Sequence, residues 1–281
     1  MTRESPPSLR REIGVFGAMM MGMGSIVGTG VFVSIGLAAE VAGPSVLLAI
    51  ALASLVAICN GLSSAQLAAN HPVSGGTYAY GYRWLTPRLG FTAGWMFLCA
   101  KAASAATAAL GFSGYLLHAT GGNQQSLLMP VALGTLVILT MVVLTGIRRS
   151  SGVNVAIVTV TLLSLAFFVV AGFSTALSHA EKNLSSFFAG GPDGSYGLLQ
   201  ATALMFVAYT GYGRVATLGE EVHDPARTIP RAIIATLGVS ALLYLAVGFV
   251  GVASVGSDAL FRATEGVGAP LEVVAREFGV Q

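Results

Sequence analysis

The chain has 281 residues, of which 54% are hydrophobic and 9% are charged. A soluble domain contains about 25% charged residues, so the composition excludes a soluble globular protein and indicates an integral membrane protein. The formal net charge of +2 gives no indication of a nucleic-acid partner, and we expect none.

Apolar segments long enough to cross about 30 Å of hydrocarbon as helices recur along the whole chain. They cover residues 13–37, 45–69, 91–117, 128–146, 153–177, 198–218 and 232–255. No segment shows the alternating pattern of about ten residues that is typical of a membrane β-strand, and backbone groups in lipid must be hydrogen-bonded internally. We therefore expect an all-α integral membrane protein with about seven transmembrane helices.

Basic residues alternate between the two sides of this predicted bundle. One side carries nine of them: Arg3, Arg10, Arg11, Arg83, Arg88, Arg148, Arg149, Arg227 and Arg231. The other side carries only Lys182, Arg262 and Arg276. Because cytoplasmic loops are enriched in Lys and Arg, we expect a cytoplasmic N-terminus in the plasma (inner) membrane.

The first span contains four glycines within "GMGSIVGTGVF" (22–32). Each glycine costs a helix up to about 1 kcal/mol relative to alanine. Gly24 and Gly28 form a GxxxG pair that would also serve close helix packing. A dinucleotide-binding fingerprint is excluded, because Val27 stands where it needs glycine and no strand precedes it.

The sixth span has a second interruption, at Gly211 and Gly213 in "ATALMFVAYTGYGRVATLGEE" (201–221). Paired interruptions in corresponding helices of two halves indicate an inverted-repeat transporter with its site near the membrane midplane. N–H groups at the start of the outer half-helix suit a carboxylate, and freed carbonyls in the other break suit an ammonium. The pair therefore predicts a site for the zwitterionic head of an amino acid.

Several segments give the chain a resemblance to the amino acid–polyamine–organocation (APC) transporter superfamily. They are "GSIVGTGVF" (24–32), "PVSGGTYAY" (72–80), "GFTAGW" (90–95) and "FVAYTGYGRVATLGEEVHDPARTIPRAI" (206–233). The resemblance implies a five-plus-five inverted-repeat, LeuT-like fold with alternating access around a central amino acid.

The resemblance also implies binding roles for both interruptions. The carboxylate-binding backbone falls on Ser25, Ile26, Val27, Gly28, Thr29 and Gly30. The ammonium-binding carbonyls fall on Val207, Ala208 and Thr210, beside Gly211, and Tyr209 and Tyr212 are candidates for lining or gating the side-chain pocket.

The expected organisation is a partial version of this fold. It has a cytoplasmic tail (1–12), a first five-helix repeat (13–177), an extracellular loop (178–197), two helices of the second repeat (198–255) and an extracellular segment before a missing eighth helix (256–281). A second repeat as long as the first would run well past residue 281, so we expect a truncated permease. Some APC transporters place a lysine in the fifth span to stand in for a coupling sodium ion, and here Thr161 occupies that region.

Two cations lie within or at the end of spans. Lys101 is near the middle of the third span, where a lysine costs at least about 2.5 to 3.5 kcal/mol. We expect it to face the bundle interior and act in coupling, because the midplane is too deep for a snorkelling side chain. Arg214 follows the second break, and either a role in gating or substrate binding or a role as a cytoplasmic anchor fits its position.

The sequence as a whole predicts a secondary active transporter that moves an amino acid with protons or in exchange for a counter-substrate, with membrane lipid around it. No nucleotide-binding loop, nucleophile–base pair or metal-ligand cluster is visible, so we expect no enzyme activity, cofactor or metal. A channel, a non-transporting assembly subunit and an inactive permease fragment are the alternatives.

Overall fold

The computed structural model describes residues 11–120, 125–144, 147–187, 194–265 and 269–278, of which residues 147–151 are described by their backbone alone. Within these ranges the chain is helical, apart from turns and one isolated bridge between Ile13 and Val222. The predicted all-α class is confirmed. The expected tail (1–12) lies almost entirely outside the described residues.

The first half of the chain forms seven helical elements. They are α1 (Val15–Ile26), the π-helical turn η1 (Gly30–Ser34), α2 (Ile35–Ala42), the 3₁₀ turn η2 (Gly43–Ser45), α3 (Val46–Asn70), α4 (Thr77–Trp84) and α5 (Pro87–Ala119).

The second half adds further helices and two 3₁₀ turns. They are η3 (Gln125–Leu127), α6 (Leu128–Leu144), α7 (Ile147–Asn183), α8 (Gly194–Tyr209), η4 (Thr210–Tyr212), α9 (Gly213–Ala216), α10 (Pro225–Val255), α11 (Ser257–Arg262) and α12 (Pro270–Arg276).

Five apolar helical segments of the described chain are long enough to cross a membrane: Val15–Asn70, Pro87–Ala119, Gln125–Leu144, Gly152–Asn183 and Pro225–Val255. The first contains two of the predicted spans, joined through η1, α2 and η2. The predicted span at 198–218 is not among the five, because α8 ends at Tyr209 after 16 residues and a 3₁₀ turn follows.

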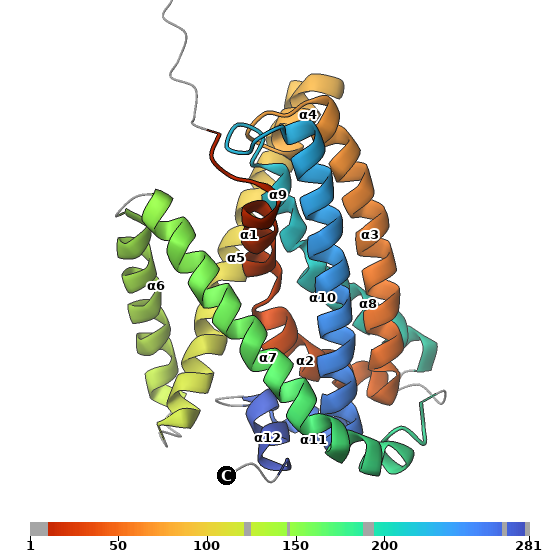
Figure 1. Cartoon of the computed structure of the whole chain (residues 1–281). Helices are drawn as coiled ribbons and strands as arrows, with labels where there is room; N and C mark the ends of the chain where they lie inside the picture. Colours follow the sequence, from red (N-terminus) through yellow and green to blue (C-terminus); the bar gives the residue numbers. More distant parts are fainter. Residues whose placement is uncertain (1–10, 121–124, 145–146, 188–193, 266–268, 279–281) are drawn as a thin grey trace, which may run out of the picture.

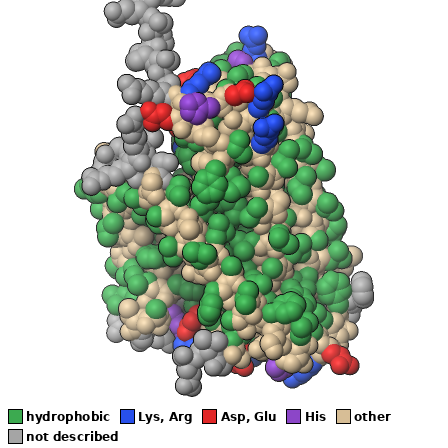
Figure 2. All heavy atoms as spheres, in the orientation of Figure 1, with side chains coloured by type: hydrophobic (Ala, Val, Ile, Leu, Met, Phe, Trp, Pro, Cys, Tyr) green, Lys and Arg blue, Asp and Glu red, His purple; other side chains and the backbone are tan. Residues whose placement is uncertain are grey.

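The helices form an upright bundle in which α10 lies at the centre (Figure 1), packed against α1, α3 and α7, while α8 packs against α3. Helices α5, α6 and α7 continue the bundle on one side, where α6 contacts α5 and α7. The core is made mainly of small and branched apolar residues from α1, α2, α3, α7 and α10. Figure 2 shows hydrophobic side chains over the middle of one face and charged side chains toward its two ends, as expected for a membrane-embedded bundle.

The segment between α3 and α5 folds into the short helix α4. Gly75 and Gly76 enter it with positive φ angles of 125° and 53°, which side-chain-bearing residues rarely adopt. A Cβ on Gly81 would lie 2.6 Å from the Cα of Gly90. Helix α4 therefore lies directly on the start of α5.

Candidate functional site

The predicted interruption in the first span is present. Helix α1 ends at Ile26, and Val27 is extended, with φ −75° and ψ 94°. The carbonyl of Gly28 then accepts N–H bonds from Val31 at 3.1 Å and Phe32 at 3.2 Å, so a new helical segment begins there. The first N–H groups of a helix have no acceptor within it, and such groups form a natural anion site.

The interruption in the sixth span differs from the prediction. Tyr209 and Gly213, on either side of η4, keep right-handed helical backbone angles, so the chain tightens into a 3₁₀ turn instead of unwinding. The carbonyl of Val207 already accepts a bond of 2.7 Å from the hydroxyl of Thr210. The carbonyl of Val207 keeps a second lone pair, so its predicted role in binding an ammonium stays a prediction.

The two interruptions lie against each other. A Cβ on Gly211 would collide with the backbone carbonyl of Ser25 and lie 2.6 Å from the side chain of Ile26. A Cβ on Gly30 would lie 2.9 Å from that of Ala208. Glycine at position 211 is therefore required by contact with the backbone of Ser25, and glycine at position 30 by contact with the side chains of Ala208 and Tyr244.

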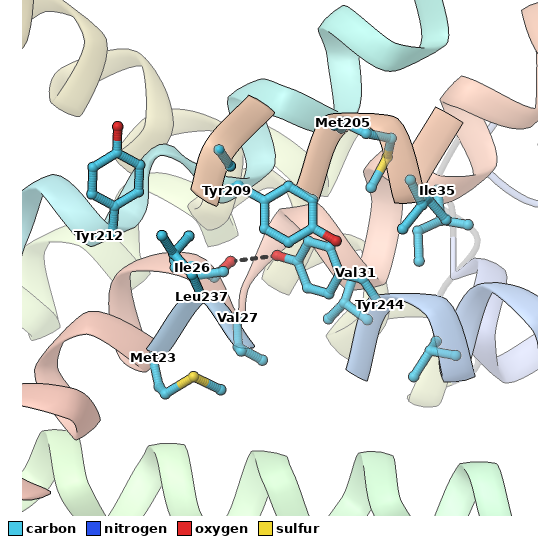
Figure 3. Packing of buried hydrophobic residues seen from close by; sticks show 14 of the residues in the cluster. Met23, Ile26, Val27, Val31, Ile35, Met205, Tyr209, Tyr212, Leu237 and Tyr244 are labelled. Atoms are coloured by element: carbon cyan, nitrogen blue, oxygen red, sulfur yellow. Dashed lines mark hydrogen bonds between the residues drawn. The ribbon is translucent and has the colours of Figure 1, made fainter. Parts of the chain in front are cut away.

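A tyrosine that the sequence analysis missed closes the end of α1. The hydroxyl of Tyr244, from α10, donates a 2.7 Å hydrogen bond to the carbonyl of Ile26 (Figure 3). Tyr244 is fully buried, and its ring centroid lies 4.9 Å from that of Tyr209. The signal was a tyrosine hydroxyl in the middle of the predicted span at 232–255, at membrane depth, where a polar group needs a partner.

The two candidate tyrosines of the sixth span point in different directions. Tyr209 lies over Tyr244, and its buried hydroxyl has no hydrogen-bond partner among the described residues. Tyr212 points away from this pair (Figure 3), and its hydroxyl interacts with Ser64 of α3. The structure therefore places Tyr209, and not Tyr212, against Tyr244, the residue that bonds to the end of α1.

Lys101 faces the first interruption, as expected. Its ammonium donates a 3.1 Å hydrogen bond to the hydroxyl of Ser25 and lies 5.6 Å from the ring centroid of Phe97. Arg214 is exposed and donates a 3.3 Å bond to the hydroxyl of Thr217, and its helix α9 packs against α1. Both cations thus belong to the surroundings of the two interruptions.

Thr161 is less well placed for coupling than the sequence suggested. Its hydroxyl donates to the carbonyl of Ile157 in its own helix, at 2.9 Å. The polar link from α7 to the first span is made by Asn154, whose side-chain amide donates to the carbonyl of Met20 at 3.3 Å. Asn154 lies about two turns nearer the α7 N-terminus than Thr161.

The described residues contain no group of three His, Cys, Asp or Glu side chains arranged to hold a metal ion. The groups that converge on the interruptions are backbone dipoles, hydroxyls and two cations. Such groups suit the binding of a small polar ligand more than covalent chemistry, which needs an activated nucleophile and a base within reach.

The sequence matches known proteins over nearly its whole length. It is 42% identical over 280 residues to the Uncharacterized transporter Rv1999c of Mycobacterium tuberculosis (strain ATCC 25618 / H37Rv). The aligned residues cover 99% of this chain and 60% of the relative. The Branched-chain amino acid permease BcaP of Bacillus subtilis is 30% identical, over 86% of this chain and 55% of its own length. The Cationic amino acid transporter 4 of Homo sapiens is 31% identical, over 86% of this chain and 41% of its own length.

The chain thus spans about 60% of the length of its mycobacterial relative. The family model described as Amino acid permease matches residues 17–281, which include both interruptions and every helix from α2 to α12. The match covers far more than half of the chain and agrees with the resemblance carried by the glycine-rich segments. This protein belongs to the amino acid permease family.

Proposed function

We propose that this chain binds an amino acid where the two interrupted spans meet, and that it forms the substrate-binding part of a secondary active transporter. The observation that carries the proposal is the contact between Gly211 and the backbone of Ser25. It sets the N-terminus of the outer half-helix beside the turn η4. An α-carboxylate would be bound by N–H groups of Thr29 and Gly30, because a helix N-terminus favours negative charge.

The ammonium of the substrate would lie near the opposite break. There the carbonyls of Val207, Ala208 and Thr210 are the candidates, and that of Val207 also accepts the hydroxyl of Thr210. The buried hydroxyl of Tyr209 has no partner among the described residues, and it would be satisfied by a bound ligand, since buried polar groups are nearly always hydrogen-bonded.

Transport would proceed by alternating access, with the N-terminus in the cytoplasm of a cell whose plasma membrane holds the protein. Energy would come from a proton gradient or from a counter-substrate. Lys101 is our candidate for the coupling group, because its ammonium already bonds to Ser25 beside the break. The relatives are named for branched-chain and for cationic amino acids. Family membership alone therefore does not identify which amino acid this protein would transport.

Binding to the purified chain in lipid nanodiscs tests this proposal. A panel of tritiated amino acids should include at least one that binds saturably and is displaced by its unlabelled form. Gly211→Ala should abolish this binding, because the new methyl group forces the two breaks apart. Gly134→Ala is the matched control, since a Cβ there has nothing within 4 Å.

The folded state of both variants is checked by size-exclusion chromatography and thermal unfolding. A folded Gly211→Ala variant that binds as well as the parent chain would place the site elsewhere. If no amino acid binds the parent chain, or if uptake by the reconstituted protein never saturates, a channel or an assembly subunit would explain the protein better than a transporter.

A further inference from the structure

The short helix α12 lies at one end of the bundle, beside α11 (Figure 1), and the proposed orientation makes this end extracellular. Two polar contacts join α12 to the end of α5. The Nδ1 atom of His118 is within ion-pair distance of the Oε2 atom of Glu272, and the hydroxyl of Tyr115 accepts the N–H of Leu271. The same hydroxyl donates to the carbonyl of Phe32, so α5 connects α12 to the outer half-helix of the first span.

The other end of α12 is held by apolar packing. The ring of Phe278, two residues after α12, lies 5.1 Å from the ring of Phe168 on α7, measured between centroids. A Cβ on Gly172 would collide with the ring of Phe278, so this ring lies directly on the backbone of α7. Apolar packing carries no charge that a proton can change, whereas the pair of His118 and Glu272 does.

The pair between His118 and Glu272 is partly shielded from water. The two side chains are 32% and 34% exposed, but the two paired atoms themselves are buried. The other carboxylate oxygen of Glu272 accepts bonds of 2.7 Å and 2.6 Å from the guanidinium of Arg276, in the same helix. Arg276 thus orients the carboxylate, and the shielding strengthens the attraction between opposite charges because the local dielectric constant is lower than that of water.

The groups that face His118 in the described part of the chain are Glu272, the guanidinium bonded to it and the hydroxyl of Tyr115. The elements η1, η3 and α6 contain no ionisable residue. Exposed ionisable side chains at this end of the neighbouring elements are Glu40 on α2, His179, Glu181 and Lys182 on α7, Asp258 and Arg262 on α11, Glu265 after α11, and Arg276 and Glu277 at the end of α12. Water and salt screen exposed charges, so Glu272 is the dominant partner of His118.

We propose that His118 and Glu272 form a pH-dependent latch, which holds α12 against the end of α5 in acid and weakens as the pH rises. Histidine changes its charge between about pH 5 and pH 8. Protonated His118 and ionised Glu272 form a charge-assisted bond, which is about twice as strong as a bond between neutral groups. Neutral His118 loses the charge attraction, and α12 then depends on Tyr115 and on its apolar contacts.

The latch has a consequence for the amino acid site. Helix α12 contacts η1, and α11 packs against α2, so both short helices lie on the outer half-helix whose first N–H groups belong to the proposed site. Looser packing of α12 at high pH would let a bound amino acid leave faster toward the outer side. This consequence rests on the proposed function, whereas the latch itself is measured without a ligand.

Hydrogen–deuterium exchange of the purified chain in nanodiscs, followed by mass spectrometry, tests the latch. Each measured rate is divided by the intrinsic chemical rate of the same amide, because chemical exchange itself accelerates with pH. The corrected rate in residues 270–276 should rise about 3-fold to 10-fold between about pH 5.5 and about pH 8, as expected for weakening one charged hydrogen bond. The centre of α10 is the internal reference and should not change.

Two variants assign the effect to the pair. His118→Gln and Glu272→Gln should each give corrected rates in residues 270–276 that are the same at both pH values. His179→Gln is the matched control, because His179 is exposed on α7 and its ring contacts the carbonyl of Thr175 in its own helix. This control should keep the pH profile of the parent chain.

A parent chain whose corrected exchange in α12 is independent of pH overturns the inference, and this measurement needs no variant to fold. A pH-dependent rise that persists in folded His118→Gln, or that His179→Gln abolishes, overturns the assignment to His118. The release of a tritiated amino acid that binds the chain should also be faster at about pH 8 than at about pH 5.5. A chain that binds no amino acid overturns the proposed function and leaves the exchange test of the latch standing.

Discussion

Tyr244 satisfies the last carbonyl of α1 at a depth where water is absent. The residue is completely buried, and its hydroxyl lies 2.7 Å from the carbonyl oxygen of Ile26. Removing one partner of a buried hydrogen bond costs about 1 to 3 kcal/mol, because the remaining group stays desolvated and unpaired. Tyr244 thus stabilises the C-terminal end of α1, where the first span is interrupted.

We expect Tyr244→Phe to lower the free energy of unfolding by about 1 to 3 kcal/mol and to weaken amino acid binding. Chemical unfolding in detergent micelles, followed by circular dichroism, measures the first effect. Tyr196→Phe is the matched control, because the side chain of Tyr196 is exposed. Equal stability of Tyr244→Phe and the control would show that the hydrogen bond to Ile26 contributes nothing measurable.

Residue type predicted the surroundings of Lys101 better than those of Thr161. A lysine at the centre of a span is so costly that it must face the interior, and its bond to Ser25 agrees with this reasoning. A threonine carries no such penalty, because its hydroxyl is satisfied by a carbonyl of its own helix, as the hydroxyl of Thr161 is. On α7 it is Asn154 that reaches the first span, where its side-chain amide donates to the carbonyl of Met20.

At the scale of elements, Tyr115 connects three segments at the outer end of the bundle. Its hydroxyl donates to the carbonyl of Phe32 in η1 at 2.9 Å and accepts the N–H of Leu271 in α12 at 3.2 Å. The carbonyl of Phe32 lies in a π-helical turn, where hydrogen bonding departs from the regular pattern. One hydroxyl from α5 thus ties α12 to the outer half-helix.

Tyr115→Phe should loosen α12 while leaving the centre of α10 unchanged. Loss of one or two hydrogen bonds, worth about 0.5 to 1.5 kcal/mol each, predicts amide exchange in residues 270–276 that is faster by about 3-fold to 10-fold. Hydrogen–deuterium exchange with mass spectrometry measures this rate, and Tyr196→Phe again serves as control. Unaltered exchange in α12 would mean that the packing of Leu271 and Val274, both buried, suffices to hold it.

The two interrupted spans show how far element prediction reaches. Glycine content located both interruptions correctly, at Val27–Gly28 and at Thr210–Tyr212. Glycine content did not distinguish an extended break from a tightened 3₁₀ turn. Glycine weakens the α-helix in both cases, and the two outcomes differ only in which backbone carbonyls find hydrogen-bond donors. In the second case the carbonyl of Val207 finds a donor in the hydroxyl of Thr210.

At the scale of the whole molecule, the distribution of basic residues predicts the orientation in the membrane. Arg88, at the start of α5, and Lys182, at the far end of α7, lie on opposite sides of the predicted bundle, and both are exposed. The positive-inside rule then places Arg88 in the cytoplasm and Lys182 outside.

Cysteine labelling tests this orientation. In a background where the exposed residues Cys59 and Cys99 are replaced by serine, Lys182→Cys should react with a membrane-impermeant maleimide on intact cells. Arg88→Cys should react only after lysis. The opposite pattern would invert the proposed topology, and each variant serves as the control for the other.

The sequence by itself determined the class of this protein, the positions of its helices and the family, because hydropathy over about 20 residues and the placement of glycine are local properties that lipid makes decisive. Tertiary structure alone decided which groups meet. The contact of Gly211 with Ser25 and the bond from Tyr244 to Ile26 join residues 186 and 218 positions apart in the chain. No local pattern encodes such pairs, since each depends on how the helices pack around α10.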